Sequence, residues 1–134
     1  MLSCQQPVLQ VLVVDDHELT RFTLKLALAS QRNIELVGLA TNGQEAVDMV
    51  ERYHPDVIVL DLEMPVMDGL SASNLIKKIA PSAQIIAYSS VENARGEAKT
   101  KKAQIDAFCQ KDAPTETLIS LINQLGQQAI ALQQ

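Results

Sequence analysis

Three aspartates follow two short apolar runs of the sequence. Asp15 and Asp16 come directly after VLQVLVV, and Asp61 comes directly after VIVL. Both runs are rich in β-branched residues and have the length of buried parallel strands, so the residues after them are expected at one edge of a sheet. Three carboxylates that converge there would form a site for a hard divalent cation such as Mg²⁺, which takes oxygen ligands.

Two later strand-like runs end in polar groups that complement these carboxylates. IIAY leads into Ser89, and AFCQ leads into Lys111. A carboxylate beside a cation can act as a nucleophile towards a phosphoryl group, while a lysine and a hydroxyl can contact the transferred oxygens. The residues therefore support phosphoryl transfer onto Asp61, with Ser89 and Lys111 in contact with the product.

The remaining sequence supplies the elements that would place these residues. Strand-like and helix-like patterns alternate five times, and the expected strands are Val8–Val14, Ile34–Ala40, Val57–Leu60, Gln84–Tyr88 and Asp106–Gln110. Five such units predict a parallel sheet with right-handed crossovers and helices on both faces. Ligands of these sheets bind beyond the carboxyl ends of the strands, where the strand order reverses.

Helical spacing of apolar residues predicts which faces pack on the sheet. The first helix carries a stripe at Leu19, Phe22, Leu26 and Ala27. The third carries Leu70, Asn74, Leu75 and Ile79, and the last carries Leu118, Leu121, Ile122 and Leu125. The segment Val91–Lys102 has Gly96 at its middle and a thin apolar stripe, so we expect a weak helix there.

Composition limits the classes of function. The chain has 134 residues, the size of one domain, and a net charge of −5 that gives no basic surface for nucleic acid or an anionic membrane. Cys4 and Cys109 are too few for a disulfide framework or a zinc site. The sequence has neither a signal peptide nor a membrane-spanning run, so we expect a cytoplasmic protein. His17 is interpreted as an exposed residue at a helix start, with a transition-metal ligand as the less favoured alternative.

The chain resembles the receiver domain of two-component response regulators from about Val8 to Leu125. The motifs that carry the resemblance are VLVVDDH, DLEMPVMDG, the strand end IIAYSS and FCQKDA. They look most like the subgroup that carries helix-turn-helix output domains. The resemblance implies a flavodoxin-like (βα)5 three-layer α/β sandwich whose parallel five-stranded sheet has the order 2-1-3-4-5.

The resemblance also implies a role for each site residue. Asp61 would be the phosphoacceptor, and Asp15 and Asp16 would hold Mg²⁺ together with Asp61 and the backbone carbonyl of Glu63. The glutamate side chain would stand at the mouth of the site and hinder an incoming water.

Three further residues would transmit the modification. Lys111 would bind the phosphoryl group, Ser89 would be the switch hydroxyl, and Phe108 would be the aromatic residue coupled to it. Their movement would alter the face formed by the fourth helix, the fifth strand and the fifth helix. In a switch of this kind, a local change of charge shifts the balance between two conformations.

Taken together, the sequence predicts a regulatory phosphoacceptor domain rather than an enzyme. Residues 1–126 would form the receiver domain, and residues 127–134 a helical tail or the start of a linker. The phosphodonor would be a histidine kinase or phosphotransfer protein. Phosphorylation would control transcription through an attached DNA-binding domain that is absent from this chain. Phosphorylation would also favour a homodimer. The domain itself would contact neither nucleic acid nor membrane.

Two alternatives remain at this point. One is a stand-alone receiver that acts by protein–protein contact. The other is a phosphatase of the haloacid-dehalogenase-like class, which is less favoured because such enzymes need an aspartate two residues after the nucleophile, where this chain has Glu63.

Overall fold

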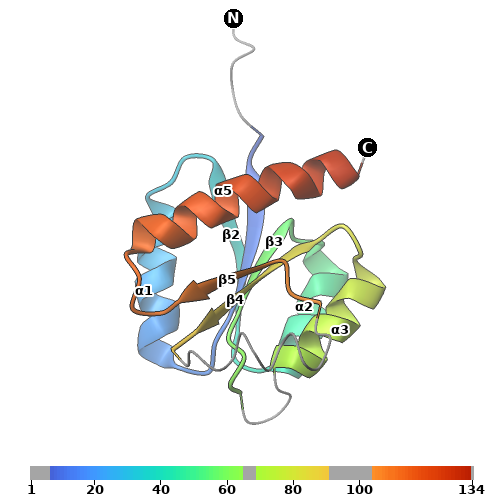
Figure 1. Cartoon of the computed structure of the whole chain (residues 1–134), viewed down its shortest axis with the longest axis horizontal. Helices are drawn as coiled ribbons and strands as arrows, with labels where there is room; N and C mark the ends of the chain where they lie inside the picture. Colours follow the sequence, from blue (N-terminus) through green and yellow to red (C-terminus); the bar gives the residue numbers. More distant parts are fainter. Residues whose placement is uncertain (1–6, 65–68, 91–103, 134) are drawn as a thin grey trace, which may run out of the picture.

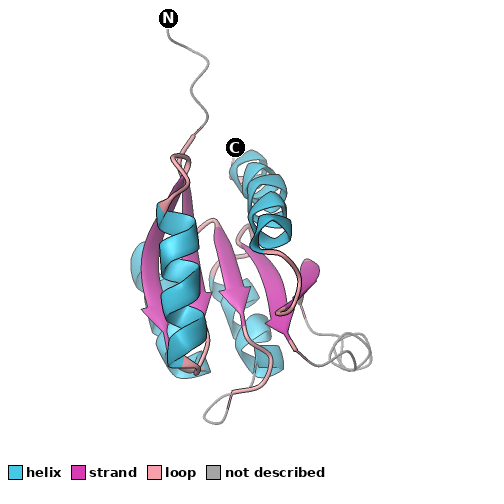
Figure 2. Cartoon of the chain, turned by 90° about the vertical axis from the view of Figure 1, so that its left-hand side faces the viewer, coloured by secondary structure: helices cyan, strands magenta, loops and turns pink. Residues whose placement is uncertain are grey.

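A parallel five-stranded sheet forms the centre of the molecule in the computed structural model, which describes residues 7–64, 69–90 and 104–133. The strands lie in the order β2-β1-β3-β4-β5, as expected for the flavodoxin-like arrangement. Their bounds are β1 Leu9–Val14, β2 Ile34–Ala40, β3 Val57–Leu60, β4 Gln84–Ser89 and β5 Ala107–Gln110. All arrowheads point towards the same edge (Figure 2), so the carboxyl ends of the strands share that edge.

The described helices cover both faces of this sheet and make a three-layer α/β sandwich. They are α1 Glu18–Ala29, α2 Gly43–Tyr53, α3 Gly69–Ile79 and α5 Thr115–Leu132. Helices α1 and α5 lie on one face, and α2 and α3 lie on the other (Figure 1). The expected weak helix Val91–Lys102 lies outside the described residues.

Alternation along the strands explains why two cores form. Val11 and Val13 of β1 pack in one buried cluster with α1 and α5, whereas Leu12 and Val14 pack in the other with α2 and α3. Successive side chains of a strand point to opposite faces, so a strand buried on both faces is apolar throughout. The side chains of β1 are thus used for the two cores, and the residues that follow β1 are those that reach the edge of the sheet.

The register of β1 and β3 determines where the acidic residues meet. Val14 is paired with Leu60, and the next backbone N–H, that of Asp61, donates a hydrogen bond to the Val14 carbonyl at 2.9 Å. On the other side of β1, the Asp15 N–H donates to the Ala40 carbonyl at 3.0 Å. The carboxyl ends of β1 and β3 are therefore aligned, and the side chains that follow them are neighbours.

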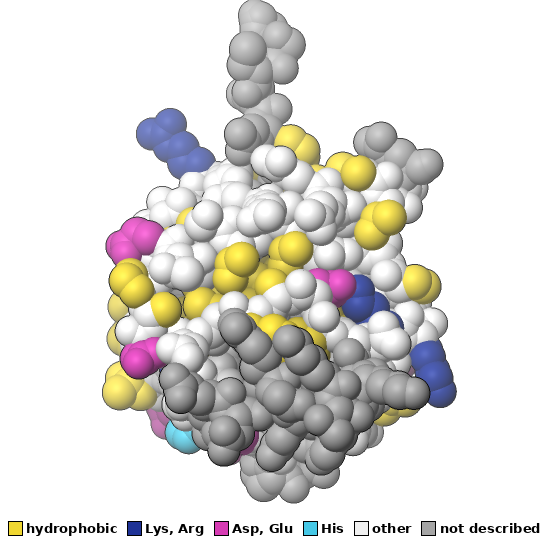
Figure 3. Space-filling model, in the orientation of Figure 1, with side chains coloured by type: hydrophobic (Ala, Val, Ile, Leu, Met, Phe, Trp, Pro, Cys, Tyr) yellow, Lys and Arg dark blue, Asp and Glu magenta, His cyan; other side chains and the backbone are white. Residues whose placement is uncertain are grey.

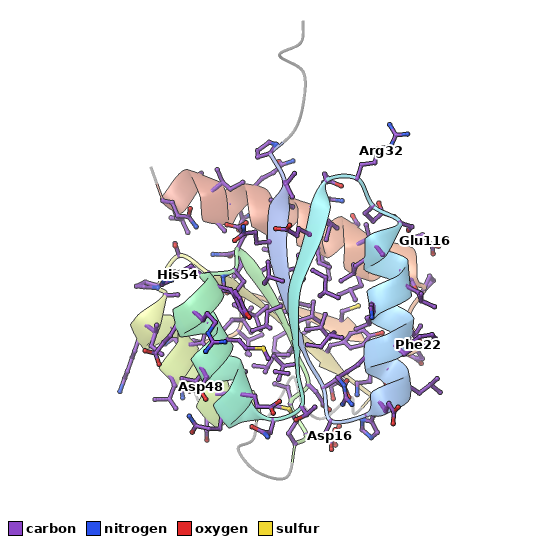
Figure 4. The ribbon with its side chains drawn as sticks, turned by 180° about the vertical axis from the view of Figure 1, so that it is seen from behind. Asp16, Phe22, Arg32, Asp48, His54 and Glu116 are labelled. Carbon is purple, nitrogen blue, oxygen red and sulfur yellow. The ribbon has the colours of Figure 1, made fainter. Side chains whose placement is uncertain are left out.

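Two of the predicted helical faces are wrong. In α1 the buried residues are Leu24 and Leu28, while Leu19, Phe22 and Leu26 are 76%, 56% and 56% exposed. Phe22 lies on the outer side of α1, away from the sheet (Figure 4). Helix α1 has apolar residues on two faces, and periodicity alone selected the face that does not pack on the sheet.

The predicted face of α3 is displaced by about one residue. Ala72, Ser73 and Ile76 are fully buried, whereas Leu75 and Ile79 are more than a third exposed. Small side chains such as those of Ala72 and Ser73 give little hydrophobic signal in the sequence, although Ala72 packs in the buried cluster on this side of the sheet. The expected face followed the larger residues instead.

Helix α5 contains the expected core residues and continues past them. Leu118, Ile122 and Leu125 are buried, and the helix extends to Leu132 with Ala129 fully buried. At Gly126 an added Cβ would lie 2.5 Å from a methyl carbon of Leu9, so the absence of a side chain lets the helix cross the start of β1 closely. The residues after Gly126 thus cover part of the core, although we expected no sheet surface there.

Candidate phosphoacceptor site

Asp15 and Asp61 form the buried floor of the site. Each side chain is only 1% exposed, and each follows the last residue of a central strand. Asp15 Oδ1 accepts a hydrogen bond from the backbone N–H of His17 at 2.8 Å, and Asp61 Oδ1 accepts one from the backbone N–H of Glu63 at 2.9 Å. These local bonds fix the orientation of both carboxylates at the edge of the sheet.

Asp16 and His17 stand at the rim above this floor. The Asp16 side chain is 29% exposed, and that of His17 is 63% exposed. The imidazole Nδ1 of His17 lies 3.0 Å from Asp15 Oδ1, 3.1 Å from Asp16 Oδ1 and 3.9 Å from Asp61 Oδ2. Figure 4 shows Asp16 at the lower end of the molecule, in the same region as the carboxyl ends of the strands.

Lys111 brings a positive charge from the end of β5. Its Nζ lies 2.8 Å from Asp15 Oδ2 and 3.5 Å from Asp61 Oδ2. Burial lowers the pKa of the ammonium, but the contact with Asp15 and the charge of Asp61 outweigh burial and raise that pKa above its usual value. Lys111 therefore stays protonated and offsets part of the negative charge.

The environment of Asp61 makes its ionised form costly. Burial is the main cause, and together with the nearby charge of Asp15 it raises the pKa of Asp61 from 3.8 to about 6, although the Glu63 N–H and the charge of Lys111 oppose the change. A raised pKa means that the folded protein holds this carboxylate ionised at neutral pH against an unfavourable free energy. A positive ion at the site would relieve that cost.

The carboxylates have unused ligand capacity for such an ion. Among the described residues, one oxygen of Asp15 and one of Asp61, Oδ2 in each case, is buried without a well-oriented hydrogen bond, since Lys111 approaches them as an ion pair only. Ligand atoms of Asp15, Asp16, His17 and Asp61 all lie within 4.8 Å of one another. The carboxylate oxygens of this group, two of which are buried with ion-pair contacts only, fit the requirements of Mg²⁺.

Ser89 and Phe108 occupy the places where the sequence predicted them, at β4 and β5. Ser89 is buried, and its Oγ donates a hydrogen bond to Glu63 Oε1 at 3.3 Å. Phe108 is paired with Ala87 in the sheet and packs in a small cluster with Leu62. The structure thus brings Ser89 into contact with the acidic loop, whereas Phe108 lies on the flank of the site.

Arg21 and Tyr88 make two further contacts at this site that were not foreseen from the sequence. The guanidinium of Arg21 donates a hydrogen bond to the backbone carbonyl of Asp15 at 2.8 Å, which ties α1 to the acidic turn. The Lys111 ammonium also lies 5.9 Å from the centre of the Tyr88 ring, a cation–π distance. Periodicity places Arg21 on a helix and Tyr88 on a strand, but it does not show which residues their side chains contact.

Comparison with known families decides the class of this site. The family model described as response regulator receiver domain matches residues 11–123, a range that contains every residue of the site. The chain belongs to the response regulator receiver domain family. The resemblance noted in the sequence is therefore confirmed.

Among curated relatives, this receiver domain resembles regulators with different outputs. It is 30% identical over 123 residues to the nitrate/nitrite response regulator protein NarL of Escherichia coli K12, covering 92% of this chain and 56% of NarL. It is 42% identical over 101 residues to a protein-glutamate methylesterase/protein-glutamine glutaminase of Methanococcoides burtonii, covering 75% of this chain but 26% of that protein. The matched chain therefore spans only about a quarter to about half of these relatives.

Solved structures show the same fold. The response regulator domain of Thermotoga maritima CheB superposes with a TM-score of 0.80 at 34% identity, covering 90% of this chain and 97% of that one. The receiver domain of NarL from Mycobacterium tuberculosis has a TM-score of 0.83 at 24% identity, covering 91% and 98%. In the part of this receiver that the structure describes, no helix has the length and apolar character that crossing a bilayer requires.

Proposed function

We propose that this receiver domain is a phosphorylation-controlled switch in which Asp61 accepts a phosphoryl group from a histidine kinase or phosphotransfer protein. One observation carries the proposal. Asp61 is a buried carboxylate whose Oδ2 has no well-oriented hydrogen bond in the described structure and faces the ammonium of Lys111 at 3.5 Å. An acceptor oxygen next to a fixed positive charge is suited to attack phosphorus.

In the proposed reaction Asp61 Oδ2 forms a new bond to phosphorus while the bond from phosphorus to the donor nitrogen breaks. The donor imidazole keeps the electron pair of that bond. Lys111 Nζ is placed to move from the carboxylates to an oxygen of the transferred group, where its charge stabilises the product. Asp15, Asp16, Asp61 and the backbone carbonyl of Glu63 would hold Mg²⁺, which, when bound, offsets the negative charge of the phosphoryl group.

Ser89 is proposed as the hydroxyl that senses the modification. Before phosphorylation its Oγ donates to Glu63 Oε1 at 3.3 Å. A phosphoryl group on Asp61 would repel the Glu63 carboxylate and offer Ser89 a more strongly charged acceptor. Phe108, whose ring is partly buried beside Leu62, would follow Ser89 and change the face formed by β5 and α5.

The exposed face of α1 suits the docking of the phosphodonor. Leu19 and Phe22 are exposed next to the acidic turn, and Leu19 also borders a groove lined by Lys111 and by Tyr88. Figure 3 shows hydrophobic side chains along the edge of the molecule where α1 lies in Figure 1. A donor that must reach Asp61 has to bind beside this rim, and an exposed apolar surface supplies binding free energy there.

The output is proposed to be transcription control through an attached DNA-binding domain, by analogy with NarL and with the transcriptional regulatory protein DegU of Brevibacillus brevis, which is 28% identical over 119 residues. A stand-alone receiver acting by protein contact is the second candidate. In either role the domain would act in the cytoplasm as a phosphoacceptor and not as an enzyme with its own substrate, and phosphorylation would favour a homodimer.

Binding of beryllium fluoride, a mimic of the phosphoryl group, in the presence of Mg²⁺ tests the proposal. NMR spectra of the wild type and of Asp61→Asn would be compared, with Asp48→Asn, an exposed carboxylate on α2, as the matched control. We expect saturable shifts at Ser89 and Lys111 in the wild type and the control, and none in Asp61→Asn. Equal binding by Asp61→Asn would contradict the proposal.

A further inference from the structure

His17 occupies an unusual position for a residue at the start of a helix. It is the residue before α1, but its side chain makes no capping hydrogen bond to the helix. Its backbone N–H is instead bonded to Asp15 Oδ1 at 2.8 Å, and its ring turns back over the acidic site. A single ring nitrogen therefore faces carboxylates that follow two different strands, Asp15 and Asp16 after β1 and Asp61 after β3.

The distances among these atoms match those of ligands that share one ion. Nδ1 of His17 is 3.0, 3.1 and 3.9 Å from the nearest oxygens of Asp15, Asp16 and Asp61. Zinc–ligand bonds of about 2.1 Å place neighbouring ligands about 3.0–3.4 Å apart in octahedral or tetrahedral geometry. A small adjustment of Asp61 would bring all three distances from His17 Nδ1 within that range.

Charge and unsatisfied oxygens also favour a cation over a simple hydrogen-bonding role for the ring. Three carboxylates face one ammonium, that of Lys111, so negative charge remains in excess. Asp61 is 1% exposed, and its Oδ2 has no well-oriented hydrogen bond among the described residues. A ring N–H directed at Asp15 and Asp16 would leave Asp61 Oδ2 with the Lys111 ammonium, 3.5 Å away, as its nearest charged partner, whereas a divalent ion would bind this oxygen directly.

The nature of the ligand set then determines the ion. Sites made of oxygen alone suit Mg²⁺, while an imidazole nitrogen favours divalent transition ions such as Zn²⁺. We propose that His17 supplies a nitrogen ligand to the cation site of Asp15, Asp16 and Asp61, so that this receiver binds Zn²⁺ more tightly, relative to Mg²⁺, than a site with oxygen ligands alone. The inference rests on the proposed function, because it concerns the same cation site.

The two histidines of the chain provide a matched pair of variants. His17→Asn replaces the ring nitrogen by an amide oxygen, and asparagine is a favourable residue before a helix. His54→Asn is the control, because His54 ends α2 with a φ of 49°, a conformation that asparagine tolerates. Figure 4 shows His54 at the upper end of α2, well apart from Asp16 at the bottom of the molecule.

Tag-free protein with Cys4→Ser would be titrated with ZnCl₂ and separately with MgCl₂ by calorimetry. The substitution removes one thiol that could bind zinc, and the other thiol, that of Cys109, is buried. We expect His17→Asn to lower the ratio of zinc affinity to magnesium affinity at least about tenfold, or about 1.4 kcal/mol. His54→Asn should leave the ratio unchanged. In long-range ¹H–¹⁵N spectra zinc should shift the Nδ1 signal of His17 and not the ring signals of His54.

An unchanged affinity ratio in His17→Asn, zinc saturation without a change in the His17 ring, or no zinc binding at millimolar concentration would each overturn the inference. Beryllium fluoride binding with Mg²⁺ would be measured on the same samples. If the wild type binds this mimic but zinc selectivity does not depend on His17, only the role of His17 is wrong. If the wild type fails to bind the mimic, the proposed function is wrong, whatever the zinc result.

Discussion

Replacing Asp61 by asparagine should stabilise the metal-free protein at neutral pH. Burial, together with the charge of Asp15, raises the pKa of Asp61 from 3.8 to about 6. At about 1.4 kcal/mol per pH unit, the ionised carboxylate costs the folded state about 3 kcal/mol at pH 7. Asparagine keeps an oxygen for the Glu63 N–H and removes the charge, so we expect a gain of about 1–3 kcal/mol.

The pH dependence has a defined sign. Because the pKa of Asp61 is higher in the folded protein than in the unfolded chain, the folded state binds more protons between about pH 4 and pH 6. The free energy of unfolding of the wild type should therefore fall, relative to Asp61→Asn, as the pH rises through that window. Below about pH 4 the two proteins should differ little from this cause.

Urea denaturation followed by circular dichroism, in buffer with a chelator, would measure the difference at pH 4, 5, 6 and 7. Asp48→Asn, in which an exposed carboxylate on α2 is changed, should show no such pH-dependent gain. Adding Mg²⁺ should stabilise the wild type more than Asp61→Asn, so the difference between their free energies of unfolding should become smaller. A variant that is no more stable than the wild type at pH 7, or a gain independent of pH, would refute the electrostatic account of the site.

Three further substitutions test other parts of the structure. Lys111→Met should weaken the binding of beryllium fluoride in the presence of Mg²⁺ at least about tenfold, because the ammonium 3.5 Å from Asp61 Oδ2 is lost. An NMR titration would measure the affinity, and an unchanged value would exclude Lys111 as a phosphoryl-binding residue. Phe22→Asp should slow phosphoryl transfer from a histidine kinase but not labelling by acetyl phosphate, because this exposed ring is proposed to contact only the protein donor; equal slowing of both rates would place the defect in the site. Gly126→Ala should lower the free energy of unfolding by up to about 2 kcal/mol, because the contact of its Cβ with Leu9 at 2.5 Å outweighs the gain of about 1 kcal/mol that alanine brings to a helix. A variant more stable than the wild type in urea denaturation would show that Leu9 adjusts without cost.

The strands and the site could be predicted from the sequence because both depend on simple rules. Runs of β-branched residues marked the strands, and parallel strands bring the residues after their carboxyl ends to one edge. Once the strand order is given, that geometry places Asp15, Asp61 and Lys111 at the same edge of the sheet. The family resemblance added the strand order, which the residues themselves did not determine.

The helical faces were harder to predict, for a physical reason. Helix α1 carries apolar residues on two faces, and hydrophobic periodicity measures amphipathicity without showing which face meets the sheet. Leu24 and Leu28 pack on it, while Leu19 and Phe22 do not. An exposed apolar face that is used for binding has the same signature in a sequence as a core face.

Contacts between side chains depend on rotamers and could not be predicted at all. The turn of the His17 ring towards the carboxylates and the bond between Ser89 and Glu63 each require a specific side-chain conformation. Sequence reasoning treated His17 mainly as an exposed residue at a helix start, and its 63% exposure agrees with that. Its contact with the acidic site is visible only in the structure.

Chemical trapping of the modified residue tests the central claim most directly. The protein would be incubated with acetyl phosphate and Mg²⁺, treated with borohydride to reduce any acyl phosphate, digested and analysed by mass spectrometry. We predict that Asp61 is converted to homoserine in the wild type and that Asp61→Asn gives no reduced residue. Reduction at another carboxylate, or none in the wild type under conditions that label a known receiver domain, would contradict the assignment of Asp61 as the phosphoacceptor.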